Sequence, residues 1–352
     1  MCKRKTVCFS IISTVLLLAI LEICAIGIAR TLDLEGNEQS PDNFKYQLQL
    51  FGSDYERLPD GRFWRCKPET VIKRGNNTHI INRDGFRDTS TDNHIPTKRS
   101  ANTRIVCLGD SVTFGAGVTD FHNTWTAKLQ EILGIEYEVI NMGVPGYSSF
   151  QGKTLMEVYH EQLKPDYIIC GFGWNDCYPA PRPDSARVYL QSTENKAIDS
   201  LKILLRYSKL YRLLTLAIHG SGSDEFDTRV PPGEFRNNLL AISEMAENTI
   251  FLTLPQAPCF EEFCKEITHE EMHEIYNGII LSLRDEGEIV LDLEQKFQSC
   301  GDECLLYGFP VLIKHGVVVG GDPIHPNERG SQKIAEFLAQ TITCSSQKPI
   351  PQ

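Results

Sequence analysis

Short apolar runs alternate with amphipathic segments over most of the chain. From residue 104 onward, five apolar runs are bounded by turn-forming residues: Arg104–Leu108, Tyr137–Met142, Tyr167–Phe172, Thr249–Leu254 and Glu288–Leu293. Uninterrupted runs of this length are typical of parallel strands that are covered on both faces. The segments between and after them have helical periodicity: Trp125–Leu133, Phe150–Leu163, Glu234–Asn248, Glu270–Asp285 and Glu328–Ile342. This alternation predicts a doubly wound α/β sheet of five strands.

A different pattern occupies residues 1–29. A basic cluster (KRK, residues 3–5) precedes an apolar run over residues 6–29 that only Glu22 interrupts. As a helix this run is about 36 Å long, enough for a hydrocarbon core of ~30 Å. We expect an uncleaved, single-pass membrane anchor with the rest of the chain outside the cytoplasm. The alternative is a cleaved signal peptide, because residues 27–29 are small or apolar enough for a cleavage site.

The region between the apolar N-terminus and the α/β pattern, residues 30–100, is polar and rich in turn formers. It predicts a stalk or an N-terminal lobe with short strands around residues 70–72 and 79–81. The α/β domain then covers residues 101–345. Within it, residues 177–233 are too long for a simple crossover and indicate an insertion.

The insertion contains basic residues at spacings of three or four: Lys202, Arg206, Lys209 and Arg212. On a helix they would form one stripe. Such a stripe fits a helix that lies on anionic lipid. It also fits a helix that packs over the sheet with its basic face in solvent, which is the interpretation we favour.

Charge and composition indicate a globular protein and argue against a nucleic-acid-binding protein. The formal net charge is −11 and the hydrophobic content is 41%, as in an ordinary globular protein with an acidic surface. The chain has no lysine- or arginine-rich block long enough to bind a nucleic acid, so we expect no nucleic-acid partner.

The cysteine content indicates a compartment. Twelve cysteines suit an oxidising environment. Four of them form two close pairs that would each close a small disulfide loop: Cys259 with Cys264, and Cys300 with Cys304. A four-cysteine zinc site is the alternative, which the irregular spacing disfavours, so we expect no metal. Cys107 and Cys170 lie inside apolar runs and are expected to be small buried hydrophobes.

Polar residues follow the ends of the predicted strands, where open α/β sheets bind ligands. The first strand ends in GDS (residues 109–111), the second in NMGVPG (residues 141–146) and the third in GFGWND (residues 171–176). The sequence GGDPIHP (residues 320–326) precedes the last helix. Each piece alone also fits a structural role, as a helix cap, a turn or a pair of metal ligands.

Together the pieces supply what acyl transfer requires. A serine hydroxyl needs an adjacent base to attack an ester, and His325 is the candidate base for Ser111. An imidazole is held in the right tautomer by a carboxylate, for which Asp322 is the candidate. The oxyanion needs preorganised donors, and the Ser111 N–H, the Gly143 N–H and the Asn175 amide are the candidates. The elbow of the α/β-hydrolases, G-x-S-x-G, is absent around Ser111.

The four blocks in this order resemble the SGNH/GDSL hydrolases over about residues 101–345. The blocks are GDS at 109–111, the Gly143 loop, GxND at 173–176 and DxxHP at 322–326, and Val112 stands where the family has Leu. The resemblance implies a flavodoxin-like three-layer α/β/α sandwich with a five-stranded parallel sheet. It implies that catalysis needs no cofactor, and it assigns these residues: Ser111, Asp322 and His325 as the triad, and Ser111, Gly143 and Asn175 as the oxyanion hole.

The expected function is that of an exported, membrane-tethered serine esterase working through an acyl-enzyme. Its substrate would be an acylated carbohydrate or a lipid, either an acetyl ester of a glycan or a short-chain or lipid ester. An alternative with the same residues is an O-acyltransferase that moves acetyl groups to cell-envelope polysaccharide. A third possibility is a non-catalytic envelope protein that binds glycan.

Overall fold

The structure is a computed structural model. It describes residues 2–31, 54–74, 77–180, 183–187, 210, 227–256, 270–298, 313–314, 317–318 and 324–345. The chain divides into two compact units. One comprises residues 1–49, 179–181 and 192–227, and the other comprises residues 50–178, 182–191 and 228–352. The basic stripe of the insertion and the two close cysteine pairs lie outside the described residues.

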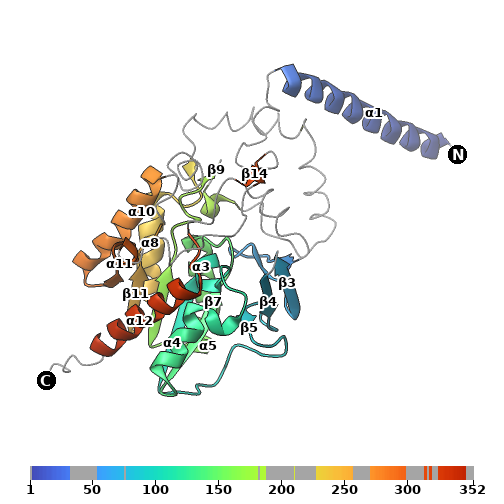
Figure 1. Cartoon of the computed structure of the whole chain (residues 1–352). Helices are drawn as coiled ribbons and strands as arrows, with labels where there is room; N and C mark the ends of the chain where they lie inside the picture. The colour runs from blue at the N-terminus through green and yellow to red at the C-terminus, as the bar shows by residue number, and fades with distance from the viewer. Residues whose placement is uncertain are drawn as a thin grey trace. The chain divides into compact units, whose positions relative to one another are not determined.

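The larger unit contains the predicted parallel sheet (Figure 1). Its five strands are β6 (Thr103–Gly109), β7 (Tyr137–Gly143), β8 (Tyr167–Gly171), β11 (Asn248–Leu252) and β12 (Ile289–Leu291). They are arranged in the order β12-β11-β8-β6-β7, and every neighbouring pair is parallel. This is the strand order of flavodoxin. The second strand, β7, lies on one side of β6, and the three later strands lie on its other side. The carboxyl end of β6 is therefore the place where such a sheet binds its ligand.

Helices cover both faces of the sheet, which confirms the three-layer α/β/α fold. On one face α4 (Trp125–Leu133) packs against α12 (Glu328–Ser345). On the other face α8 (Pro232–Ser243) packs against α5 (Ser149–Leu163) and α10 (Glu270–Ser282). The core under α4 and α12 is apolar and joins both helices to the strands through Trp125, Leu129, Ile334, Leu338, Ile105 and Ile169, among others.

Several predicted boundaries differ from the structure by a few residues, and two of the differences have a clear cause. The helix expected over Glu234–Asn248 ends at Ser243, because the chain must turn before Asn248 joins β11. The strand expected over Glu288–Leu293 stops at Leu291, because the Asp292 carboxylate accepts the Gln295 N–H at 3.0 Å and caps a helix. That helix is α11 (Leu293–Gln298).

Residues 54–100 form small antiparallel sheets within the same compact unit as the parallel sheet. Strand β1 (Tyr55–Arg57) pairs with β2 (Trp64–Cys66). Strands β3 (Thr70–Arg74), β4 (Asn77–Ile81) and β5 (Arg87–Asp88) form a second sheet. The two short strands predicted in this region are thus confirmed as β3 and β4.

The remaining elements are short. They are α3 (Ser111–Phe114), the 3-10 turns at Phe121–Asn123, Asp184–Ala186 and Leu283–Glu286, and the strands β9 (Pro179–Ala180), β10 (Asp227–Thr228), β13 (Ile313–Lys314) and β14 (Val317–Val318).

The first helix, α1 (Cys2–Thr31), is present where the apolar run predicted it. Among the helices of the described residues, none is both long and apolar enough to cross a membrane. The anchor predicted over residues 1–29 stays a prediction.

Cys107, Cys170 and Cys177 are free thiols. Cys107 and Cys170 are buried in β6 and β8, as predicted, and Cys66 and Cys177 are buried as well. Burial raises the pKa of Cys177 to about 12, so this thiol stays protonated at neutral pH. The disulfide prediction concerns pairs outside the described part of the chain.

Candidate active site

Strand β6 ends in a turn, residues 109–114, that places Ser111 at the carboxyl edge of the sheet. We call it the Ser111 turn. The Asp110 carboxylate accepts the Val112 N–H at 2.8 Å and caps α3, so Ser111 is the first residue of that helix. A Cβ on Gly109 would lie 2.7 Å from the Gly171 carbonyl oxygen, which explains why the turn starts with glycine. The capping role and the catalytic role expected of these residues are therefore compatible.

His325 lies beside Ser111. Its Nε2 is 2.7 Å from Ser111 Oγ, within the range that a general base needs to take the hydroxyl proton. His325 stands just before Pro326 and α12, 214 residues from Ser111 in sequence. The predicted nucleophile and base are therefore together. Asp322 lies outside the described residues, and its role stays a prediction.

Asn175 is tied to the same turn through Asp110. Its Nδ2 donates to Asp110 Oδ2 at 2.9 Å, which fixes the orientation of the amide next to Ser111. Burial raises the pKa of Asp110 to about 6, while the hydrogen bonds from Val112 and Asn175 and the nearby His325 act in the opposite direction. At neutral pH this carboxylate is ionised and accepts from both partners.

The N–H of Gly143, a predicted oxyanion donor, makes a hydrogen bond within the protein. It donates to Asn141 Oδ1 at 2.9 Å and is therefore already occupied. A Cβ at this position would lie 2.6 Å from the Thr113 carbonyl carbon, inside van der Waals contact. Glycine here lets the backbone of α3 approach β7. The close contact at Gly143 is with the protein's own backbone.

The turn after Gly143, residues 144–147, offers another donor; we call it the Gly146 turn. The Val144 N–H donates to the Gly109 carbonyl at 3.0 Å, and the Tyr147 N–H closes the turn on the Val144 carbonyl at 3.1 Å. Pro145 has no N–H. Within the described residues this leaves the Gly146 N–H as the donor of this turn that no protein group accepts. Because Val144 is hydrogen-bonded to Gly109 at the end of β6, the turn begins beside the Ser111 turn.

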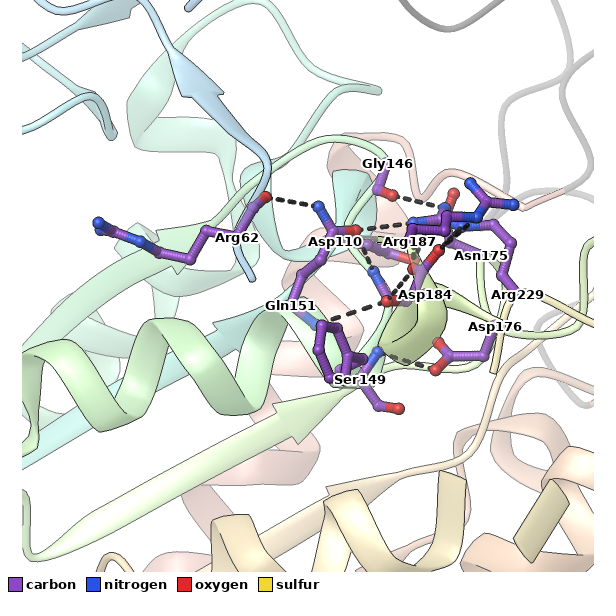
Figure 2. Close-up of polar contacts among 12 residues, drawn as sticks. Arg62, Asp110, Gly146, Ser149, Gln151, Asn175, Asp176, Asp184, Arg187 and Arg229 are labelled. Atoms are coloured by element: carbon purple, nitrogen blue, oxygen red, sulfur yellow. Dashed lines mark hydrogen bonds and ion pairs between the residues drawn. The ribbon is translucent and has the colours of Figure 1, made fainter. Parts of the chain in front are cut away.

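Behind the Gly146 turn lies a buried ionic network that sequence reasoning missed (Figure 2). The Asp184 carboxylate pairs with Arg229 at 2.8 Å and with Arg187 at 3.4 Å, and it accepts the Ser148 hydroxyl at 2.7 Å. Arg229 also donates to the Gly146 carbonyl at 2.8 Å. Asp184 and Arg229 stand near opposite ends of the predicted insertion, and nothing in their spacing indicates that they meet.

Asp176, next to Asn175, is buried beside this network. Its Oδ1 accepts the Ser149 N–H at 2.8 Å, and its Oδ2 is buried with no hydrogen-bond partner among the residues that the structure describes. Burial raises the pKa of Asp176 to about 7, opposed by the Ser149 hydrogen bond and by Arg229. In the part of the chain that the structure describes, no group of three histidine, cysteine or acidic side chains is placed to hold a metal ion.

Comparison with known proteins identifies the family of the chain. Residues 107–333 match the model of the GDSL-like lipase/acylhydrolase family. An acetylxylan esterase from Xylanibacter ruminicola is 24% identical over 254 residues, which cover 70% of this chain and 45% of that protein. The chain thus spans about half the length of this relative.

Solved structures with a similar chain path have low identity. A carbohydrate acetylesterase from Sinorhizobium meliloti superposes with a TM-score of 0.41 at 14% identity, over 69% of this chain and 99% of that one. A lipase/acylhydrolase from Enterococcus faecalis gives a TM-score of 0.44 at 17% identity, over 71% and 100% of the two chains.

Proposed function

The chain belongs to the GDSL-like lipase/acylhydrolase family, and on that premise we propose that it hydrolyses carboxylic esters with Ser111 as the nucleophile. The observation that carries this proposal is the 2.7 Å contact between His325 Nε2 and Ser111 Oγ at the carboxyl end of β6. A hydroxyl with a base at this distance can lose its proton as it attacks a carbonyl carbon.

The reaction has two halves. Ser111 Oγ bonds to the ester carbonyl carbon as His325 Nε2 takes the hydroxyl proton. The bond to the alcohol oxygen then breaks, His325 returns the proton to the leaving alcohol, and an acyl ester remains on Ser111. Water hydrolyses that ester by the same sequence, with His325 as base and then as acid. We assign Asp322 to hold the imidazole in the tautomer that this cycle requires.

The developing oxyanion needs donors that are already in place. We assign the N–H of Ser111 at the start of α3, the free amide N–H of Asn175, and the N–H of Gly146 in place of that of Gly143. The assignment of Asn175 is supported by its bond to Asp110, which leaves its second N–H available. The assignment of Gly146 is supported by the commitment of the other N–H groups of its turn.

We propose acetyl esters of polysaccharides as the substrate class. The support is the relative described as an acetylxylan esterase, whose similarity extends over 70% of this chain. An acetyl-specific enzyme should release acetate from acetylated xylan and prefer p-nitrophenyl acetate to longer esters.

The test is hydrolysis of p-nitrophenyl esters from acetate to dodecanoate by the full-length chain, with Ser111→Ala and Ser282→Ala assayed alongside. Ser282 is an exposed serine at the end of α10, so its loss should leave turnover unchanged. Turnover that depends on Ser111 supports the esterase. Equal turnover by Ser111→Ala contradicts it, and a preference for dodecanoate contradicts the acetyl substrate.

We also propose that the catalytic domain works outside the cytoplasm, held at the membrane by the N-terminal segment. The support is the sequence alone: the basic cluster at residues 3–5 followed by the apolar run. Fractionation of cells that express the full chain should place the protein in the membrane fraction, open to protease added from outside. Intact mass then decides whether residues 1–29 remain, and recovery in the cytosol contradicts the proposal.

A further inference from the structure

The direction of one peptide group decides whether Gly146 can act as a donor. The Gly146 turn has Pro145 at its second position and Gly146, with φ of 81°, at its third, which defines a type II turn. In a planar trans peptide the C=O and the N–H point in opposite directions. Whatever holds the Pro145 carbonyl therefore also directs the Gly146 N–H.

The alternative orientation is within easy reach. A type I turn differs mainly by a flip of the central peptide and keeps the closing hydrogen bond between Tyr147 and Val144. Glycine accepts the backbone angles of both forms. After a flip the Pro145 carbonyl oxygen would take the place of the N–H and repel an oxyanion. The Pro-Gly sequence favours the type II form, and contacts from outside the turn add to that preference.

Trp64 holds the Pro145 carbonyl. Its indole Nε1 donates to the Pro145 oxygen at 3.3 Å, and the side chain is buried. The Trp64 carbonyl in turn accepts the Tyr147 hydroxyl, and the two rings meet edge to face with centroids 5.6 Å apart. Trp64 lies on β2, outside residues 107–333 that match the family model. The N-terminal segment thus supplies a contact that the matched region does not contain.

Arg229 holds the next carbonyl along the turn, that of Gly146. Its Nη1 donates to the Gly146 carbonyl at 2.8 Å, and its guanidinium lies 5.9 Å from the Trp64 ring centroid. Nη2 is fixed by Asp184 at 2.8 Å and by Gln151 at 2.7 Å, all of them buried (Figure 2). Trp64 and Arg229 therefore fix two successive carbonyls of the Gly146 turn.

We propose that Trp64 and Arg229 are positioning residues that hold the Gly146 turn in the orientation in which its N–H faces the substrate carbonyl. This inference rests on the proposed function and gives residues 54–100 a part in it. It predicts a loss confined to the transition state, because only the oxyanion uses the Gly146 N–H.

The first test is Trp64→Phe, which keeps an aromatic ring in the core and removes the indole donor together with part of the ring volume. With p-nitrophenyl acetate, kcat should fall about tenfold to a hundredfold. This loss should not exceed the loss expected when one oxyanion donor is removed outright. KM should change less than about twofold, as for an interaction made only in the transition state. The affinity for an alkylboronic acid, which forms a tetrahedral adduct on serine, should fall by the same factor as kcat.

The matched control is Gln130→Met. Gln130 lies on α4 and contacts the first residue of β7, at the end of that strand away from Ser111. Gln130 Nε2 donates to the carbonyls of Gly134 and Tyr137 at 3.0 and 2.9 Å, so its loss also removes side-chain donors to backbone carbonyls. It should lower Tm without changing kcat or boronate affinity. If kcat follows Tm in both variants, the role of Trp64 is structural and the proposal fails.

Arg229 gives a second, independent test. Arg229→Lys keeps the charge beside Asp184 and one donor, whereas Arg229→Met removes both, so Lys should recover part of the kcat that Met loses. If Trp64→Phe is too unstable to assay, this pair answers the same question. Serine-dependent turnover with wild-type kcat in Trp64→Phe and Arg229→Lys alike overturns the positioning role alone. Absence of Ser111-dependent turnover in the wild type overturns the proposed function and this inference with it.

Discussion

Two neighbouring strands, β6 and β7, end at the same edge of the sheet in turns that are stabilised in different ways. The Ser111 turn is shaped mainly by its own residues, with Asp110 capping α3 and Gly109 allowing the close approach of Gly171. Trp125 and Asn141 add donors to its Val112 and Thr113 carbonyls from α4 and β7. The Gly146 turn is held by Trp64 and Arg229, which are 81 and 83 residues away from it in sequence. A motif of consecutive residues therefore describes the first turn well. It describes the second poorly, because the contacts that orient that turn are not local.

The largest effect is expected in the Ser111 turn. Ser111→Ala removes the nucleophile and should lower kcat on p-nitrophenyl acetate on the order of 10⁴-fold or more. The measurement is steady-state turnover, with circular dichroism to show that the variant is folded. Because the turn is held by Asp110 and not by the serine hydroxyl, Tm should stay near the wild-type value. A large fall in Tm would contradict the local account of this turn.

Asn175→Ala tests the link between the third strand and the Ser111 turn. The variant loses an oxyanion donor and should lower kcat by about 10²- to 10³-fold, or about 3 to 4 kcal/mol of transition-state stabilisation. It also frees Asp110 Oδ2, which Asn175 now occupies at 2.9 Å. Steady-state kinetics should show KM nearly unchanged. Full activity would remove Asn175 from the oxyanion hole.

Alanine at the two glycines of the second loop separates packing from catalysis. Gly143→Ala places a Cβ 2.6 Å from the Thr113 carbonyl carbon and should cost about 1 to 3 kcal/mol of stability through overpacking. Gly146→Ala strains a backbone φ of 81° by about 1 to 2 kcal/mol and disturbs the donor itself. Thermal unfolding should therefore rank Gly143→Ala as the less stable variant. The ratio of kcat loss to Tm loss should be larger for Gly146→Ala, and the reverse ranking would return the donor to Gly143.

The smallest effect concerns Asp176, whose carboxylate accepts the Ser149 N–H just after the Gly146 turn. Its pKa is raised to about 7 by burial, above an ordinary value near 4. The folded state keeps a proton that the unfolded state has released, so this group makes stability decrease as pH rises from about 4 to 7. Asp176→Asn cannot ionise. Its Tm relative to wild type should therefore increase between pH 5 and pH 8, and a constant difference would mean that Asp176 is ionised throughout.

The fold and the proximity of Ser111 and His325 could be predicted from the sequence, for physical reasons that particular residues show. The strands were recognisable because buried parallel strands are uninterrupted apolar runs, and β6 over Thr103–Gly109 is buried along almost its whole length. Ser111 and His325 were recognisable because each lies at a strand end or before the last helix. The sequence did not indicate that the Gly143 N–H, predicted to bind the oxyanion, donates to Asn141 Oδ1 in the structure.

The surroundings of the Gly146 turn could not be predicted, because contacts between residues far apart in sequence form them. The pairing of Asp184 with Arg229 and the bond from Trp64 to Pro145 depend on how loops from distant parts of the chain pack on the sheet. Neither has a spacing or a periodicity that a sequence displays. The polar composition of residues 30–100 suggested a stalk or a lobe and gave no indication that Trp64 would contact the loop beside Ser111.

The central claim is that Ser111 forms the covalent intermediate, and trapping tests it most directly. The full-length chain would be treated with an alkyl fluorophosphonate, and the modified residue would be located by peptide mass spectrometry. The account predicts one phosphonyl group per chain, on Ser111, with labelling reduced when p-nitrophenyl acetate competes. An unlabelled protein that still hydrolyses the ester, or a label on another serine, would contradict it.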